Sequence, residues 1–70
     1  MADTLKISLK AARVNAGMTQ DDVCKKMHIT QATLRNWESG RVNIPFISLT
    51  ALSNLYNMPV DNIFLEYRST

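Results

Sequence analysis

The segment from Thr19 to Gly40 constrains the fold of this chain more than any other part. It reads as two short helices joined by a tight turn, His28-Ile29-Thr30. Thr19, with Asp22 three residues later, approximates a capping box at the start of the first helix. Thr30 is a good N-cap for the second helix, Gln31 to Ser39, and Gly40 ends it. The pattern predicts a bihelical unit whose second helix exposes small and polar side chains.

Length and cysteine content limit what can stabilise the fold. The chain has 70 residues, which allows one domain, residues 1–70, with one modest core. Cys24 is the only cysteine and His28 the only histidine, which excludes a disulfide staple and makes a zinc site unexpected. We therefore expect no metal and no cofactor. A lone thiol fits a reducing cytoplasm, and no membrane span or signal peptide is visible, so we expect a cytoplasmic protein without a membrane partner.

Charge is distributed unevenly along the chain. The net charge is only +2, which excludes a polybasic tail or a histone-like protein. Residues 1–41 hold seven Lys or Arg against four Asp or Glu, whereas residues 42–70 hold one against two. The positive surplus lies in the half that contains the bihelical unit, as a phosphate-facing surface would require. Lys10 is expected to be a solvated charge, with a backbone phosphate as its alternative contact.

Three further helices are predicted around this unit, with no strand pattern. The first runs from about Leu5 to Ala16, capped by Asp3 or Thr4 and stopped by Gly17. The fourth follows Pro45 and ends before Asn57-Met58-Pro59. A fifth runs from Val60 to about Glu66 and packs Ile63 and Phe64 against the rest. The fold class is therefore all-α, a compact five-helix bundle. Residues expected in the core include Leu9, Ala12, Val23, Cys24, Met27, Leu34, Trp37, Phe46, Leu49, Leu52, Ser53 and Tyr56.

The outer face of the helix Gln31 to Ser39 carries the candidate functional residues. Leu34 and Trp37 point inward, which leaves Gln31, Ala32, Thr33, Arg35 and Asn36 wholly or partly outside. In the DNA major groove, Gln and Asn pair with adenine, Arg with guanine, and Ala or a Thr methyl contacts the thymine methyl. Gln20 should lie beside Gln31 and could brace it while holding a phosphate, which free N–H groups at that helix start would also bind.

Several blocks at intact spacing carry a family resemblance: Arg13, Gly17-Met18-Thr19-Gln20, Ile29 to Leu34, Trp37-Glu38-Ser39-Gly40, and Asn57 to Asp61. Over about Leu5 to Leu65, the chain resembles the xenobiotic-response-element family of helix-turn-helix regulators, which includes phage repressor domains and Cro proteins. The resemblance implies a five-helix fold of the lambda-repressor type. It also implies DNA binding by the third helix and a two-fold dimer on a palindromic operator.

The resemblance also implies roles for single residues. Gln20, Gln31, Ala32 and Asn36 would face bases or their flanking phosphates. Thr19, Ser39, Arg41 and Asn43 would hold the phosphate backbone. Arg35 stands where members of the family vary most, so its target stays open. Glu38 would turn inward to pair with Arg13 of the first helix.

Three residues depart from the family pattern. His28 stands at a turn position that is usually Gly and commonly needs a positive φ, which His adopts at some cost. Cys24 replaces the usual Ala at a close contact between helices, where a buried thiol fits. Trp37 stands where Tyr is frequent and should only enlarge the core.

The end of the fourth helix and the segment after it are predicted to form a dimer interface. Its candidate residues are Asn57, Met58, Pro59, Asn62 and Leu65, with Tyr67 beside them. The alternative is that Met58 and Leu65 merely close the small core. Because the patch is small, we expect a weak homodimer that the operator assembles.

The sequence as a whole favours a sequence-specific, DNA-binding transcriptional regulator, with repression as the expected output. Double-stranded operator DNA is the expected partner, and no small-molecule ligand is evident. The alternative is a helix-turn-helix module for protein contact, or an antitoxin, with little DNA binding of its own. An enzyme is not expected, because the chain has no nucleophile–base pair, paired carboxylates, phosphate loop or metal cluster. The operator sequence and the regulated genes stay open, as does whether the chain is the front of a longer repressor.

Overall fold

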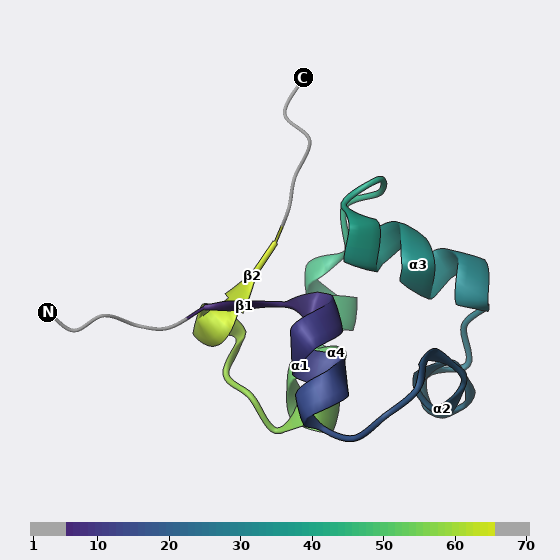
Figure 1. Cartoon of the computed structure of the whole chain (residues 1–70). Helices are drawn as coiled ribbons and strands as arrows, with labels where there is room; N and C mark the ends of the chain where they lie inside the picture. Colours follow the sequence, from purple (N-terminus) through teal and green to yellow (C-terminus); the bar gives the residue numbers. More distant parts are fainter. Residues whose placement is uncertain (1–5, 66–70) are drawn as a thin grey trace, which may run out of the picture.

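A computed structural model describes residues 6–65 of the chain, and its order of elements is given in Figure 1. Four α-helices make up most of it: α1 Leu9–Asn15, α2 Gln20–Met27, α3 Gln31–Ser39 and α4 Phe46–Tyr56. A 3-10 turn, η1 Val60–Asn62, follows α4. Two short strands, β1 Ile7–Ser8 and β2 Ile63–Phe64, pair in parallel with Ile7 opposite Ile63. In Figure 1, α1 and α4 lie at the centre, the strands at one side, and α2 with α3 at the other.

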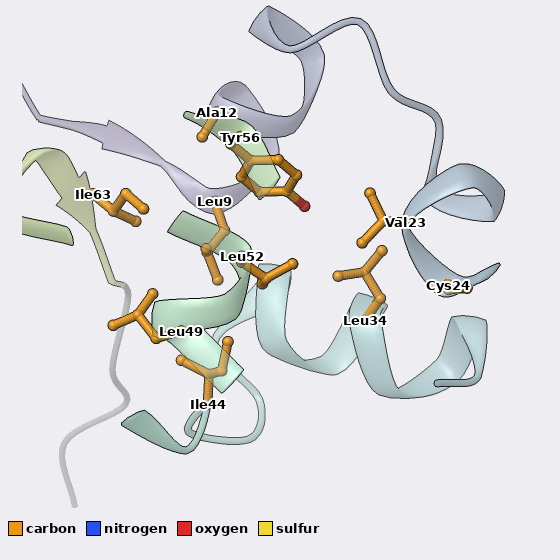
Figure 2. Close-up of a cluster of buried hydrophobic side chains, with 10 residues drawn as sticks. All are labelled: Leu9, Ala12, Val23, Cys24, Leu34, Ile44, Leu49, Leu52, Tyr56 and Ile63. Carbon is orange, nitrogen blue, oxygen red and sulfur yellow. The ribbon is translucent and has the colours of Figure 1, made fainter. Parts of the chain in front are cut away.

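The core lies between these two sides and collects apolar side chains from every helix (Figure 2). Val23, Leu34 and Leu52 are fully buried. They come from α2, α3 and α4, so these three side chains join the bihelical unit to α4 within one core. Trp37 is partly buried and packs against the same cluster. The predicted inward direction of Leu34 and Trp37 is therefore confirmed.

Local capping signals place the ends of α2 and α3 where the sequence predicts them. The Thr19 hydroxyl accepts from the N–H of Asp22, and the Asp22 carboxylate accepts from the N–H of Thr19, which completes the capping box. Thr30 caps α3 through the N–H of Thr33. Gly40 adopts a left-handed conformation directly after α3, with φ of 79°. These hydrogen bonds satisfy backbone groups that a helix leaves free at its ends.

The predicted fifth helix is wrong, and so is the predicted absence of strands. After Pro59 the chain makes one 3-10 turn, and Ile63 then becomes extended and pairs with Ile7. β-Branched side chains favour extended backbone over helix, and pairing with Ile7 buries Ile63. The bundle therefore has four α-helices and a two-stranded sheet in the described part. The predicted contribution of Glu66 lies outside the described residues.

The first helix begins later than predicted, at Leu9. Ser8 is its N-cap, because its side-chain oxygen accepts the N–H of Ala11 at 3.0 Å. Asp3 and Thr4, the cap candidates, and Leu5, the predicted first residue of the helix, lie outside the described residues. Gly17, with φ of 74°, follows the helix end as predicted.

Two aromatic residues expected in the core are exposed instead. Phe46 is 73% exposed, because the preceding loop buries Ile44 at that end of α4. Phe64 is 50% exposed, because neighbouring residues of a strand face opposite sides and Ile63 takes the inner one. The remaining predicted stripe of α4, Leu49, Leu52, Ser53 and Tyr56, is buried.

Candidate functional site

The outer face of α3 is open along the helix, because Leu34 directs the opposite face into the core. Gln31, Ala32 and Arg35 are exposed, while Thr33 and Asn36 are partly buried. The hydroxyl of Thr33 lies 2.9 Å from the hydroxyl of Thr30, so the α3 N-cap occupies it. What Thr33 offers outward is therefore chiefly its methyl group. The face combines amide, guanidinium and small apolar groups, the set that distinguishes base edges in a major groove.

The turn before α3 sets the angle between the two helices. His28 ends α2 in the left-handed region, with φ of 59° and ψ of 46°. The expected positive φ is confirmed at this non-glycine position. Such a conformation is uncommon for a residue with a Cβ atom and is held here by the structure on both sides.

A buried ion pair anchors the far end of α3. Arg13 Nε donates to Glu38 Oε2 at 2.8 Å, and their side chains are only 9% and 6% exposed. Arg13 Nη1 also donates to the carbonyl oxygen of Met18 at 3.0 Å. The structure thus brings Arg13 and Glu38 together as the resemblance implies. One guanidinium holds α1, the α1–α2 connection and α3 in register.

Gln20 joins this ion pair rather than Gln31. Its Nε2 donates to Glu38 Oε1 at 3.1 Å, whereas no hydrogen bond joins it to Gln31 in the described part. A carboxylate only accepts hydrogen bonds, so the nitrogen of the Gln20 amide must face Glu38. The expected brace on Gln31 is therefore replaced by one on Glu38, because an ionised acceptor attracts the amide N–H more strongly than a neutral one. The carbonyl oxygen of Gln20 stays available.

Two neighbouring cavities run along this surface. The first has a volume of about 560 Å³ and is lined by Lys10, Gln20, Ala32, Arg35, Asn36, Glu38, Ser39 and Arg41. The second lies beside the α1–α2 connection, and its lining includes Lys10, Arg13, Thr19, Gln20 and Gln31. Together they bring eight of the ten predicted DNA-contact residues to one surface. Thr33, Asn43 and the turn that holds His28 line neither cavity.

The predicted phosphate-binding residues surround the reading face of α3. Thr19 is exposed at the start of α2, and its hydroxyl accepts from Asp22, which leaves the hydroxyl proton free to donate. Ser39 donates to the carbonyl oxygen of Asn36 at 3.3 Å. Arg41 is exposed and lines the first cavity, whereas Asn43 is exposed outside it. Lys10, whose role the sequence left open, lines both cavities.

The remaining chemical groups of residues 6–65 do not form a second centre. Cys24 is buried on α2, and this burial raises the pKa of its thiol, as expected for a packing residue. Among residues 6–65, no three His, Cys, Asp or Glu side chains cluster as metal ligands would. No helix in the described part has the length and apolar content needed to cross a membrane.

Comparison with known families finds one match. The family model described as helix-turn-helix matches residues 9–63, from the start of α1 to β2. Comparisons with curated proteins and with solved structures found no significant match.

Proposed function

The chain belongs to the Cro/C1-type helix-turn-helix family, whose members are DNA-binding regulators, and we propose that it is a sequence-specific transcriptional repressor. The carrying observation is the open outer face of α3, whose side chains line two cavities and which the Arg13–Glu38 ion pair holds from behind. A recognition helix must be rigidly placed and must also leave its reading side chains free. α3 meets both requirements.

In this proposal α3 lies in the major groove and reads base edges from its first turns. Gln31 and Asn36 pair with adenine through their amides, while Ala32 and the Thr33 methyl contact thymine methyl groups. Gln20 adds an acceptor from α2, because Glu38 holds its amide nitrogen. Its free carbonyl oxygen suits a base amino group better than a phosphate, which only accepts hydrogen bonds.

Phosphate contacts on both sides of α3 orient the domain on the duplex. Thr19 and the free N–H groups at the start of α2 bind one phosphate, and Arg41 and Asn43 bind the DNA backbone near the other end of α3. Ser39 joins them by turning its hydroxyl proton from the carbonyl oxygen of Asn36 to a phosphate. Arg35 lines the first cavity within the reading face, where it serves a guanine or a phosphate. The excess of positive charge in residues 1–41 supports this orientation.

A two-fold dimer completes the proposal, because a single helix reads too few base pairs for selectivity in a genome. Two copies place their recognition helices one DNA turn apart, about 34 Å. The proposed contact is made by Asn57, Met58, Pro59, Asn62 and Leu65. Met58 and Leu65 are partly buried and pack against the core, so Asn57 and Pro59 are its most exposed members.

Selection of bound duplexes from a random library tests the proposal directly. We expect an enriched palindrome with half-sites one helical turn apart, and an affinity that falls steeply with salt. Enrichment of no sequence, with no salt-dependent binding, would contradict the proposal. It would favour a helix-turn-helix module that contacts proteins.

Two variants separate base reading from phosphate binding. Gln31→Ala should cost about 1–3 kcal/mol on the selected site and little on random DNA. Arg41→Ala should weaken binding to both and flatten the salt dependence. Equal losses on both duplexes for Gln31→Ala would show that Gln31 does not read a base.

The dimer is tested on the selected palindrome by titration in a gel-shift assay. The wild type should load two subunits cooperatively, and Met58→Asp should reduce that cooperativity. Pro59→Glu repeats the test at an exposed residue outside the core. Independent loading of the half-sites by the wild type, or unchanged cooperativity in Pro59→Glu together with folded Met58→Asp, would exclude this interface.

A further inference from the structure

Lys10 of α1 lines both cavities of the candidate site. It is exposed, and it is the one residue of α1 in the lining of the first cavity. It also lines the second cavity, beside Thr19 and Gln20. Lys10 therefore stands on the border between the two cavities that the reading face of α3 helps to line. This border is formed by α1, an element outside the helix-turn-helix itself.

The charges that line the first cavity together with Lys10 favour an anion. Arg35 and Arg41 line the first cavity with it, so cations from α1, α3 and the following loop converge there. None of the three forms an ion pair within residues 6–65. The acidic group in the same lining, Glu38, already shares its carboxylate with Arg13 at 2.8 Å. The cavity thus keeps an uncompensated positive charge.

The stability of α1 does not explain a lysine at this position. Lys10 is the second residue of α1, and the first turn of that helix has no acidic side chain. A cation near a helix N-terminus interacts unfavourably with the helix dipole, by an amount on the order of several tenths of a kcal/mol. A role toward an external anion explains the same placement.

We propose that Lys10 binds a phosphate of the DNA backbone and so extends the DNA-contact surface from the helix-turn-helix onto α1. This inference rests on the proposed DNA-binding function. A phosphate is favoured over a base because Lys10 lies beside α3 rather than on its reading face. An ammonium on a flexible stem also binds phosphate as a point charge, without fixed geometry.

The test compares Lys10→Met with Lys26→Met. Both remove one positive charge from an exposed lysine on a helix, and Lys26 lines neither cavity and forms no ion pair in the described part. Affinity for the selected duplex and for a random duplex is measured over a series of salt concentrations, with thermal melting as a check of folding. Lys10→Arg tests rescue by a residue of the same charge.

Lys10→Met should lower affinity for both duplexes by the same factor, up to about eightfold at 0.1 M salt, and reduce the slope of log K against log salt by about 0.9. Lys26→Met should leave the slope unchanged, and Lys10→Arg should restore it. Equal behaviour of the two Met variants would overturn the inference while leaving DNA binding intact. Loss on the selected duplex alone would overturn it in favour of base reading. If the wild type shows no salt-dependent binding, the proposed function itself fails, before any variant is compared.

Discussion

The helix pair α2–α3 and the helix α4 are held in place by different kinds of interaction. α2 and α3 have side-chain caps at Thr19 and Thr30, and an ion pair with Arg13 anchors the end of α3. α4 begins at Pro45 without any side-chain cap and is held by the burial of Leu49, Leu52 and Tyr56. Polar, directional contacts thus position the reading helix, whereas apolar burial positions its support.

This difference follows from what each element must leave exposed. A recognition helix cannot use its outer face for packing, so local hydrogen bonds and one buried anchor must fix its orientation. α4 has no such constraint and turns a large apolar stripe inward. The first two predictions probe the strongest polar anchor and the weakest point of the apolar support, and the third concerns a single cap.

The largest effect is expected at the ion pair. Glu38→Ala leaves the Arg13 guanidinium buried without its carboxylate, which should lower the free energy of unfolding by about 3–5 kcal/mol. Chemical denaturation measures this loss. DNA affinity should fall only in proportion to the unfolded fraction and the freed Gln20 amide.

The double variant Arg13→Met with Glu38→Leu sharpens that prediction. Replacing both charges by apolar groups of similar size removes the unpaired charge, so most of the lost stability should return. DNA affinity should not return fully, because Gln20 would still lack its acceptor. A double variant as unstable as the sum of two single variants would show that polar anchoring is not what the pair contributes.

In α4, a substitution at Tyr56 is expected to raise stability rather than lower it. Its hydroxyl is fully buried without a hydrogen-bond partner in the described part, and Figure 2 shows it directed toward the side of the core formed by Val23 and Leu34. Burial also raises the pKa of this phenol well above its usual value. Tyr56→Phe removes the unsatisfied group and should raise the free energy of unfolding by about 1 kcal/mol.

Ser53 provides the matched control on the same helix. Its buried hydroxyl donates to the carbonyl oxygen of Met58, so Ser53→Ala should lower stability by about 1 kcal/mol. Thermal melting of both variants compares a partnered with an unpartnered hydroxyl. A loss of stability in Tyr56→Phe would indicate that the Tyr56 hydroxyl has a partner, such as a buried water.

The same contrast explains which parts could be predicted from the sequence. α2 and α3 were predictable because their ends depend on nearby residues, such as Thr19 with Asp22 and Thr30 before Gln31. The segment after Pro59 was not, because Ile63 is extended through pairing with Ile7, near the other end of the described chain. Hydrophobic spacing over a few residues cannot distinguish such a strand from a helical turn.

The candidate site shows the same limit at the level of side chains. The outward residues of α3 follow from helical spacing once Leu34 is placed inside. The partner of Gln20 does not, because it depends on where Glu38 lies after pairing with Arg13. The position of Lys10 between two cavities likewise arises from the packing of α1 against α3, which no local pattern encodes.

The smallest effect is expected at the α2 capping box and depends on pH. The Asp22 carboxylate accepts the N–H of Thr19 at 2.9 Å, and this backbone hydrogen bond, followed by the side-chain one, lowers the pKa of Asp22 below its usual 3.8. A lowered pKa in the folded state means that the stabilisation is fully present above pH 3.8 and is lost as the pH falls through the folded value.

Asp22→Asn keeps an acceptor for Thr19 but cannot titrate. The wild type should therefore melt slightly higher than Asp22→Asn near neutral pH, and this difference should vanish in acid. All other carboxylates titrate in both proteins, so the comparison isolates Asp22. A difference that stays constant from neutral pH to well below 3.8 would show that the charge of Asp22 does not stabilise the start of α2.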